Sequence, residues 1–371
     1  MKIAVIGDPH LGCTTYTDKR ISDFSKQFNL SIEESLKRKV NAVFLLGDVF
    51  DSSAYRRSVD NFAACIGDVA ESLVKLKEAG IEVFAIGGNH EYGRGRQGGE
   101  LRILSDLEII NFLDDEVKEF NGYRIGGISW KSDRESFKET LEKLGKPSAN
   151  SILLMHQFCE GSHFIPAFVA EIKKEDLKEW PVVFTGHHHQ YEDLRYAVTP
   201  GSLEIHVAKE LGKKGFVLYD TDTKRHEFVV LPPSRNIRYT EMNGEGKSPK
   251  DFQKAIEIWI RSNSSAGALL VIQIDGTLSS GRSADIEWQH LRSIGNQLGC
   301  LKVHFDGGLQ DQVRTAPEIR ATVNFQDFIK KRFASRQKQA VQYVEAFREK
   351  GDEFSDSILN GILEEAGGKK K

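Results

Sequence analysis

The stretch Asp8-Pro9-His10 follows a short apolar run at residues 3–6, and four later stretches of the chain repeat this arrangement. They are Gly47-Asp48, Gly88-Asn89-His90, His156 and Gly186-His187-His188-His189. Each follows an apolar run typical of a buried strand, and these runs are residues 42–46, 83–86, 151–155 and 182–185. A buried strand that stops at a polar residue presents it at the carboxyl end of an open α/β sheet, where ligand sites lie. We therefore expect five strand ends to meet at one place.

The residue types at these strand ends indicate which metal ions the expected site binds. Imidazole suits borderline divalent metals, while carboxylate and amide oxygens suit harder ions, so a mixed set fits Mn²⁺ or Fe²⁺ better than Zn²⁺ in a sulfur site. One carboxylate can bridge two cations about 3.5–4 Å apart, and such a pair stabilises both oxygens of a displacement at phosphorus. A single His after a strand is usually a satisfied polar residue, but five such stretches in order predict a two-metal site.

Composition limits the class of protein. With 371 residues, 39% hydrophobic and 28% charged, the chain can bury a sizeable core in two or three domains. A net charge of −3 neither requires nor excludes a nucleic-acid partner. Without a signal peptide or an apolar run near the ~18 residues that span a membrane, we predict a cytoplasmic protein with no membrane segment. The scattered cysteines are typical of reduced thiols, and they are Cys13, Cys65, Cys159 and Cys300.

Periodicity predicts an α/β fold. Apolar spacings of three and four residues predict helices over residues 18–40 and 58–79, and Gly80 suits the left-handed cap of the second helix. The alternation of strands and helices implies a largely parallel first sheet. Further short strands are predicted at residues 123–128, 151–155, 182–185, 195–198, 203–207, 216–219 and 227–231, and we expect a second, mostly antiparallel sheet. The predicted fold class is two stacked mixed β-sheets flanked by helices.

Pro232-Pro233-Ser234 marks the predicted end of the first domain, residues 1–234. Residues 235–325 are predicted to form a small α/β cap domain, in which Ser248-Pro249 begins a helix to about residue 261. The cap also has predicted strands at 268–274 and 300–305 and a helix at 283–298, and its balanced charge carries no signature of DNA binding. Residues 326–371 are predicted to contain two helices, which pack either on their own domain or on a partner helix.

The loop that contains Arg94 and Arg96 is rich in glycine and lies beside the predicted metal site. Two arginines in such a loop can approach a phosphate backbone closely, so they are tentative DNA-binding residues. A solvated loop with no ligand explains the same composition equally well, and both interpretations stay open.

The order D-x-H, G-D, G-N-H-E, H and G-H-x-H resembles that of the calcineurin-like metallophosphoesterases. The extended motifs are similar to those of SbcD-type nuclease subunits of the DNA double-strand-break repair complex. These motifs are Asp8–Gly12, Gly47–Asp51, Leu154–Gln157, Pro200–Ile205 and Lys214–Asp220. The resemblance covers residues 1 to about 235. Members of the family vary in sequence after the G-D-x-F motif, and the segment that begins with Asp51 occupies the site where some members carry His. If that position helps to place the substrate, the preference of this protein for DNA ends differs from theirs.

The resemblance implies a role for each matched residue. Asp8, His10 and His189 would hold one metal. Asn89, His156 and His187 would hold the other, Asp48 would bridge the two, and the cofactor is two Mn²⁺ per subunit. His90 would assist catalysis at the scissile phosphate without ligating a metal, and Glu91 would support the site from behind. The remaining histidines are assigned no chemistry, and they are His163, His188, His206, His226, His290 and His304.

The resemblance also implies a function and partners. We expect a Mn²⁺-dependent DNA exonuclease and endonuclease that forms a homodimer and works with an SbcC-type ABC ATPase, whose coiled coil binds residues 326–371. The cap would help to hold DNA. The first alternative is a stand-alone phosphodiesterase for cyclic nucleotides or small phosphodiesters, against which the long segment after Ser234 counts. The second is a scaffold with a vestigial site, which would need a missing ligand.

Overall fold

The structure is a computed structural model that describes residues 1–52, 59–92, 97–163 and 171–311. The chain divides into two compact units, Met1–Gln312 and Val313–Lys371, and the account below concerns the described part of the first. Arg94, Arg96 and the helices predicted within residues 326–371 lie outside the described residues. Among the described residues, no helix is both long enough and apolar enough to cross a membrane.

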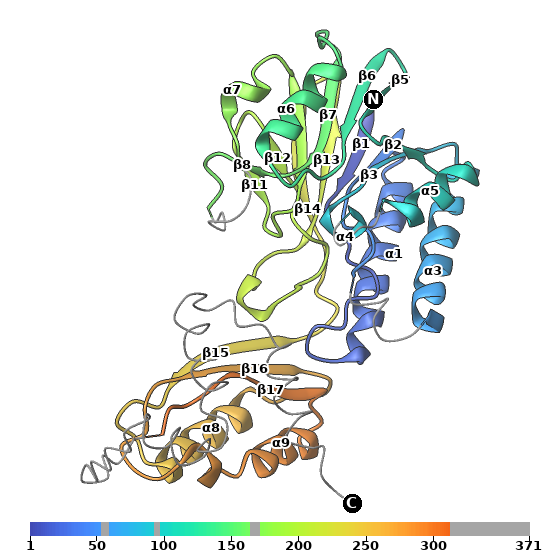
Figure 1. Cartoon of the computed structure of the whole chain (residues 1–371). Coiled ribbons are helices and arrows are strands. Elements are labelled where there is room, and N and C mark those ends of the chain that lie inside the picture. Colours follow the sequence, from blue (N-terminus) through green and yellow to red (C-terminus); the bar gives the residue numbers. More distant parts are fainter. Residues whose placement is uncertain (53–58, 93–96, 164–170, 312–371) are drawn as a thin grey trace, which may run out of the picture. The chain divides into compact units, whose positions relative to one another are not determined.

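The first sheet has the strand order β14-β13-β1-β2-β3-β4. Strands β1 to β4 run parallel, and β13 and β14 add an antiparallel edge beside β1. Three helices cover its outer face, as Figure 1 shows in blue and cyan. The strands are β1 (Lys2–Ile6), β2 (Ala42–Leu46), β3 (Glu82–Ile86), β4 (Asn111–Phe112), β13 (Gly215–Asp220) and β14 (Arg225–Val230), and the helices are α1 (Ile21–Lys37, preceded by η1, Asp18–Arg20), α3 (Val59–Glu78) and α5 (Gly99–Asp106).

The second sheet has the strand order β11-β12-β10-β7-β6-β5, with helices α6 and α7 packed on its outer face. These elements are β5 (Glu116–Phe120), β6 (Tyr123–Ile128), β7 (Ser151–His156), β10 (Val182–Gly186), β11 (Glu192–Asp193), β12 (Val198–Thr199), α6 (Arg134–Lys143) and α7 (Lys174–Leu177). A separate short pair joins β8 (Phe158–Cys159) to β9 (Glu171–Ile172). Two stacked mixed sheets flanked by helices confirm the predicted fold class.

Strand β1 shows why the layers stack. Successive side chains of a strand point to opposite faces, so Ile3 and Val5 enter the core between the two sheets. Ala4 and Ile6 enter the core beneath the helices, where they meet Phe28 of α1. These four residues are fully buried, and Lys2 at the start of the strand is exposed. A strand that is apolar on both faces is stable only when layers cover both of them. The polar residues that directly follow such a strand are therefore also placed inside the protein.

Parts of the prediction for the second sheet are wrong. Its centre is parallel, because β6, β7, β10 and β12 all run the same way, and only β5 and β11 are antiparallel. The strands predicted at 216–219 and 227–231 belong to the first sheet, where Val217 pairs with Val5. Hydrophobic pattern alone carries no information on strand direction or on the choice between two sheets. Helices α6 and α7 supply the crossovers that parallel neighbours require.

Residues 203–207 were predicted as a strand, but the structure has none there. Ser202 makes a single bridge with Gly7, and the segment then enters a short 3₁₀ turn, η3 (Ala208–Glu210). Its apolar residues Ile205 and Ala208 are buried against Val271 and other residues of the cap. The apolar pattern therefore reflects contact with the cap and not a strand.

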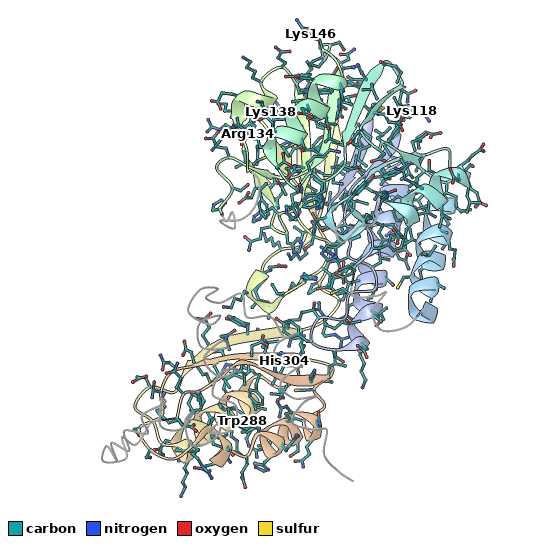
Figure 2. All side chains as sticks on the ribbon, viewed as in Figure 1. Lys118, Arg134, Lys138, Lys146, Trp288 and His304 are labelled. Carbon is teal, nitrogen blue, oxygen red and sulfur yellow. The ribbon has the colours of Figure 1, made fainter. Side chains whose placement is uncertain are left out.

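The described part of the cap is a parallel sheet, β15-β16-β17, packed on two helices. Its elements are β15 (Ile237–Asn243), α8 (Pro249–Asn263), β16 (Leu269–Asp275), η4 (Ser283–Asp285), α9 (Trp288–Gln297) and β17 (Lys302–Gly307). Ser248 caps α8 as predicted, because its hydroxyl oxygen accepts from the Asp251 backbone N–H at 3.2 Å. Strand β15 was not predicted, since most of its side chains are partly exposed. Trp288, labelled in Figure 2, packs edge-on against Phe305.

Candidate metal centre

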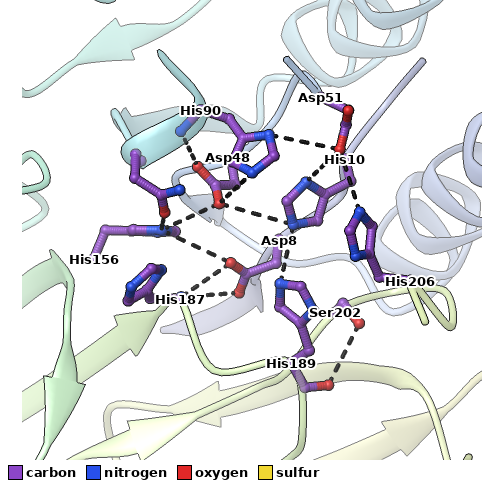
Figure 3. Close-up of polar contacts among 12 residues, drawn as sticks. Asp8, His10, Asp48, Asp51, His90, His156, His187, His189, Ser202 and His206 are labelled. Atoms are coloured by element: carbon purple, nitrogen blue, oxygen red, sulfur yellow. Dashed lines mark hydrogen bonds and ion pairs between the residues drawn. The ribbon is translucent and has the colours of Figure 1, made fainter. Parts of the chain in front are cut away.

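Strands of both sheets bring the predicted residues together, and Figure 3 shows Asp8, His10, Asp48, His156, His187 and His189 around one centre. Three strands belong to the first sheet: β1 leads to Asp8 and His10, β2 to Asp48, and β3 to Asn89 at the start of α4 (Asn89–Tyr92). Two belong to the second sheet: β7 ends at His156, and β10 leads to His187 and His189. Because parallel strands of one sheet end at the same edge, the centre lies where the carboxyl edges of the two sheets meet.

The backbone is strained where these strands end. Asp8, His10, Asp48 and His187 have φ values of 47°, 48°, 49° and 82°, which is the left-handed region that residues other than glycine seldom adopt. Such conformations persist only when the surrounding structure holds them, and they concentrate at functional sites. In this backbone conformation, each polar side chain points away from the strand direction and toward the centre.

Gly47 of the G-D motif has a steric role. It has a φ of +85°, and a Cβ there would lie 2.6 Å from the Gly88 backbone nitrogen and 2.6 Å from His156 Nδ1. Any larger residue would push apart the loops after β2 and β3 and displace a histidine of the second sheet. The glycine before Asp48 is therefore required by the close approach of three strand ends.

The first donor set comprises Asp8, His10 and His189. His10 Nε2 and His189 Nε2 lie 3.1 Å apart. Their other ring nitrogens face carboxylates, with His10 Nδ1 3.3 Å from Asp51 Oδ2 and His189 Nδ1 2.9 Å from Glu210 Oε1. Carboxylates behind the rings favour the proton on Nδ1, so both Nε2 lone pairs point at the centre. Two such lone pairs at this distance repel each other unless a proton or a cation lies between them.

The second donor set comprises Asp48, His156 and His187, and Asn89 joins it because its Oδ1 lies 3.1 Å from His156 Nε2. His156 Nδ1 donates to the Leu46 carbonyl oxygen at 2.7 Å. That backbone hydrogen bond fixes the tautomer of the ring, so Nε2 is again the free ligand atom. Among the described residues, further overlapping groups of potential ligands are His10, Asp48 and His90; His10, Asp51 and His206; and His189, His206 and Glu210.

Asp48 lies between the two sets. Its Oδ1 accepts from the His90 backbone N–H at 2.7 Å, which fixes the orientation of the carboxylate. Its Oδ2 is 3.4 Å from His156 Nε2 and 3.8 Å from His10 Nε2, so one oxygen faces a histidine of each set. A carboxylate oriented in this way is suited to bridging two cations.

Burial shapes the protonation of the centre. It lowers the pKa of His10 and of His187 to about 3, which leaves both imidazoles neutral, the form that binds metals. It also raises the pKa of Asp8 to about 6. At His156 burial acts to lower the pKa, but the charges of Asp48 and Asp8 outweigh it and raise the pKa to about 9. The neutral imidazoles of His10 and His187 beside buried carboxylates fit divalent cations, whose charge would compensate the carboxylates. At His156 a cation would have to replace the proton that the neighbouring carboxylates hold on the ring.

His90 lies at the rim of the centre, with its side chain 22% exposed. Its Nδ1 accepts from the Ser52 backbone N–H at 3.0 Å, so the proton of the neutral ring is on Nε2. That Nε2 lies 4.0 Å from Asp48 Oδ2 and faces the metal ligands. His90 is therefore placed to donate a proton to a group that binds at the centre.

Glu91 supports the loop that carries Asp48. Its fully buried carboxylate accepts from the backbone N–H groups of Asp48 and Gly88, both at 2.8 Å, and from that of Phe50 at 2.9 Å. Burial raises the pKa of Glu91 to about 7. These bonds tie the end of β2 to the end of β3, in agreement with the supporting role expected for Glu91.

The sequence prediction missed some residues of the centre. His206 was left outside it, but its ring centroid lies 4.8 Å from that of His10, and its Nε2 is 3.4 Å from Asp51 Oδ2. The roles of Asp51 and Glu210 behind the ligand rings were also not foreseen. The only signal in the sequence was that His206 directly follows the Pro200–Ile205 motif. His188 was likewise assigned no chemistry, and its Nε2 lies 3.3 Å from Glu192 Oε1.

Comparison with known proteins identifies a family and relatives. The sequence model of the family described as "Calcineurin-like phosphoesterase" matches residues 1–204. A protein of Archaeoglobus fulgidus, named "DNA double-strand break repair protein Mre11", is 29% identical over 285 residues, which cover 66% of this chain and 62% of that protein. A Methanococcus maripaludis protein of the same name is 29% identical over 279 residues, which cover 69% of this chain and 73% of the relative.

A third relative is the "Exonuclease subunit 1" of Enterobacteria phage T4, which is 26% identical over 296 residues. The match covers 76% of this chain and 80% of the phage protein. The chain thus spans less than two thirds of the Archaeoglobus protein and a larger share of the other two. In every case the match is longer than the phosphoesterase region alone, so it extends into the cap.

Proposed function

This chain belongs to the calcineurin-like phosphoesterase family, and we propose that it is a manganese-dependent DNA nuclease that acts in double-strand-break repair. It would hydrolyse phosphodiester bonds as an exonuclease and an endonuclease. The observation that carries the proposal is the close clustering of potential metal ligands from both sheets, with Asp48 Oδ2 facing His10 and His156. The names of the relatives, two repair proteins and an exonuclease subunit, favour DNA as the substrate.

Under this proposal, two ions would be held by two sets of residues. Asp8, His10 and His189 would hold one ion, and the other would be held by Asn89, His156 and His187. Asp48 would contact both. Two divalent ions, when bound, supply positive charge at the phosphate oxygens and activate water as the nucleophile. Mn²⁺ suits this mixture of imidazole, carboxylate and amide ligands.

The side chains at the rim would complete the reaction. His90 presents its Nε2–H to the centre, so the neutral ring can donate a hydrogen bond to the oxygen that leaves phosphorus. Full transfer of the proton would require the imidazolium form, in which Nδ1 is also protonated and releases the Ser52 N–H. The Asp48 carboxylate keeps the His90 backbone in place through the hydrogen bond at 2.7 Å. A single hydrogen bond thus links the proposed bridging ligand, Asp48, to the backbone of His90, the proposed donor.

We further propose the domain limits 1–234, 235–325 and 326–371. The cap would help to hold DNA, and residues 326–371 would bind the coiled coil of an SbcC-type ABC ATPase. In support, the matches to the repair proteins extend beyond the phosphoesterase region. The alternative is a phosphodiesterase that acts alone on cyclic nucleotides or other small diesters, and a substrate comparison separates the two.

The decisive comparison uses linear double-stranded DNA and a small phosphodiester, each with Mn²⁺ and with Mg²⁺. We expect degradation of DNA that depends on Mn²⁺, measured by gel and by release of acid-soluble nucleotide. The preparation depleted of metal by a chelator is the control, and its activity should return when Mn²⁺ is added. Turnover of the small diester with DNA untouched would overturn the nuclease proposal in favour of the stand-alone phosphodiesterase.

Helix α5 offers a surface for the proposed homodimer. Ile103 of α5 and Leu107, the residue directly after the helix, are four residues apart and are 52% and 61% exposed. Neighbouring exposed apolar residues commonly mark a protein interface. We expect the double substitution Ile103→Glu and Leu107→Glu to convert a dimer into a monomer, measured by light scattering after size exclusion. Ile258→Glu, at a residue of α8 that is 57% exposed, is the matched control. A double variant that stays dimeric would exclude this interface.

A further inference from the structure

Two carboxylates lie behind the histidines of the first donor set. Asp51 Oδ2 is 3.3 Å from His10 Nδ1, and Glu210 Oε1 is 2.9 Å from His189 Nδ1. Asp51 is buried, with 3% of its surface exposed, and Glu210 is partly buried. Each carboxylate orients one ring, so together they determine where two of the three ligand atoms of this set point.

His206 connects these two carboxylates. Its Nε2 lies 3.4 Å from Asp51 Oδ2, and its backbone N–H donates to Glu210 Oε2 at 3.2 Å. Its ring centroid lies 4.8 Å from that of His10 and 5.3 Å from that of His189. One residue therefore contacts both supports and packs against both histidine rings of the set.

A buried arginine fixes the position of His206. Arg20, from the turn before α1, is fully buried and donates to the carbonyl oxygens of Ile205 and His206, the latter at 3.2 Å. Phe24, one turn later, meets the His206 ring edge-on with centroids 6.5 Å apart. The position of His206 is thus set by the interior of the protein, although 21% of its side chain is exposed.

The second donor set has a different support. His156 donates its Nδ1 proton to the backbone carbonyl of Leu46 at 2.7 Å. A backbone partner inside β2 is independent of the segment that contains His206. A change at His206 should therefore reach His10 and His189 and leave His156 in place.

We propose that His206 is a positioning residue for only one of the two ions, the one held by Asp8, His10 and His189. The inference rests on the proposed two-ion centre. His206 acts through Asp51 and Glu210, without contact with the ion or the substrate. Its loss would allow the His10 and His189 rings to turn, and the affinity for that one ion would fall.

Manganese binding to the metal-free full-length protein tests the proposal without any substrate. Titration calorimetry and electron paramagnetic resonance report the affinity of each ion and the signal of a coupled pair. In His206→Ala we expect one ion to bind about 10- to 100-fold more weakly, with the other changed less than about twofold and the coupled signal lost. His206→Gln should recover part of the affinity, because its amide N–H can still donate to Asp51.

His226→Ala is the matched control. His226 also has a side chain 21% exposed and a carboxylate neighbour, Asp193, at 3.6 Å, but it lies on β14 and belongs to neither donor set. It should leave both affinities unchanged. Asp51→Asn and Glu210→Gln, which keep the shapes of the side chains, should each weaken the same ion as His206→Ala. These variants decide the question if His206→Ala does not fold.

Two results would overturn the role of His206: equal weakening of both ions, or no weakening of either, in variants whose thermal unfolding matches that of the wild type. A wild-type protein that binds a single ion would instead contradict the proposed two-ion centre. The effect of His206→Ala on that single ion would still decide whether His206 positions its ligands.

Discussion

Replacing Asp48 by alanine is expected to abolish both metal binding and hydrolysis. The Asp48 Oδ2 atom faces His156 at 3.4 Å and His10 at 3.8 Å, so the substitution removes a ligand from both ion positions at once. It also leaves the partly buried backbone N–H of His90 without its acceptor, which costs about 1 kcal/mol of stability. We expect metal content near zero by elemental analysis and no detectable turnover of DNA or of a small diester.

Asp48→Asn separates the two effects. An amide keeps the shape of the side chain and an acceptor oxygen for His90, but it lacks the negative charge, so folding should be retained while activity is lost. Asp176→Asn is the control, because the Asp176 side chain is also largely buried and is held by Arg134, and neither residue belongs to a group of potential ligands among the described residues. Retention of two Mn²⁺ ions by Asp48→Ala would exclude the bridging role.

Replacing His90 by serine is expected to remove hydrolysis of DNA by a factor of about 10²–10⁴ while metal binding is retained. The substitution removes the Nε2 proton that faces the centre, but the backbone N–H that holds Asp48 remains. Rates measured at saturating Mn²⁺, with metal content determined on the same samples, give the result. Loss of metal from His90→Ser would show that His90 is a ligand or a structural support.

Substrates with different leaving groups test the proposed proton donation directly. A nitrophenolate leaves without protonation, so a nitrophenyl diester should lose much less rate in His90→Ser than DNA, whose leaving alkoxide needs a proton. His226→Ser, at a half-buried histidine on β14, should leave both rates unchanged. Equal losses on both substrates would mean that His90 orients the phosphate and does not donate the proton.

Prediction of the fold succeeded where the signal was local. The runs at residues 42–46, 151–155 and 182–185 match β2, β7 and β10 to within one residue, because an uninterrupted apolar run with a polar stop describes a buried strand completely. The cap at Ser248 was predictable for the same reason, since an N-cap followed by proline is a pattern of adjacent residues.

Prediction failed where the structure of a segment depends on the distant part of the chain that it contacts. β13 joined the first sheet because it pairs antiparallel with β1, and no feature of residues 215–220 indicates which of two sheets they enter. Residues 203–207 are apolar in part because Ile205 meets the cap, so the pattern of a strand appeared without a strand. Strand direction also depends on the connections between strands, and the sequence pattern does not show how those connections run. This applies to β6, β7, β10 and β12.

The sequence by itself determined the fold class and the grouping of the candidate ligands, because each ligand follows the end of a buried strand and such ends meet at one sheet edge. Only the tertiary structure decided which residues stand behind the ligands. Asp51 follows β2, whereas His206 and Glu210 lie four residues apart at η3, and packing of these two distant segments brings them together around His10 and His189. Contacts of this kind depend on how whole layers pack, and they leave no pattern in neighbouring residues.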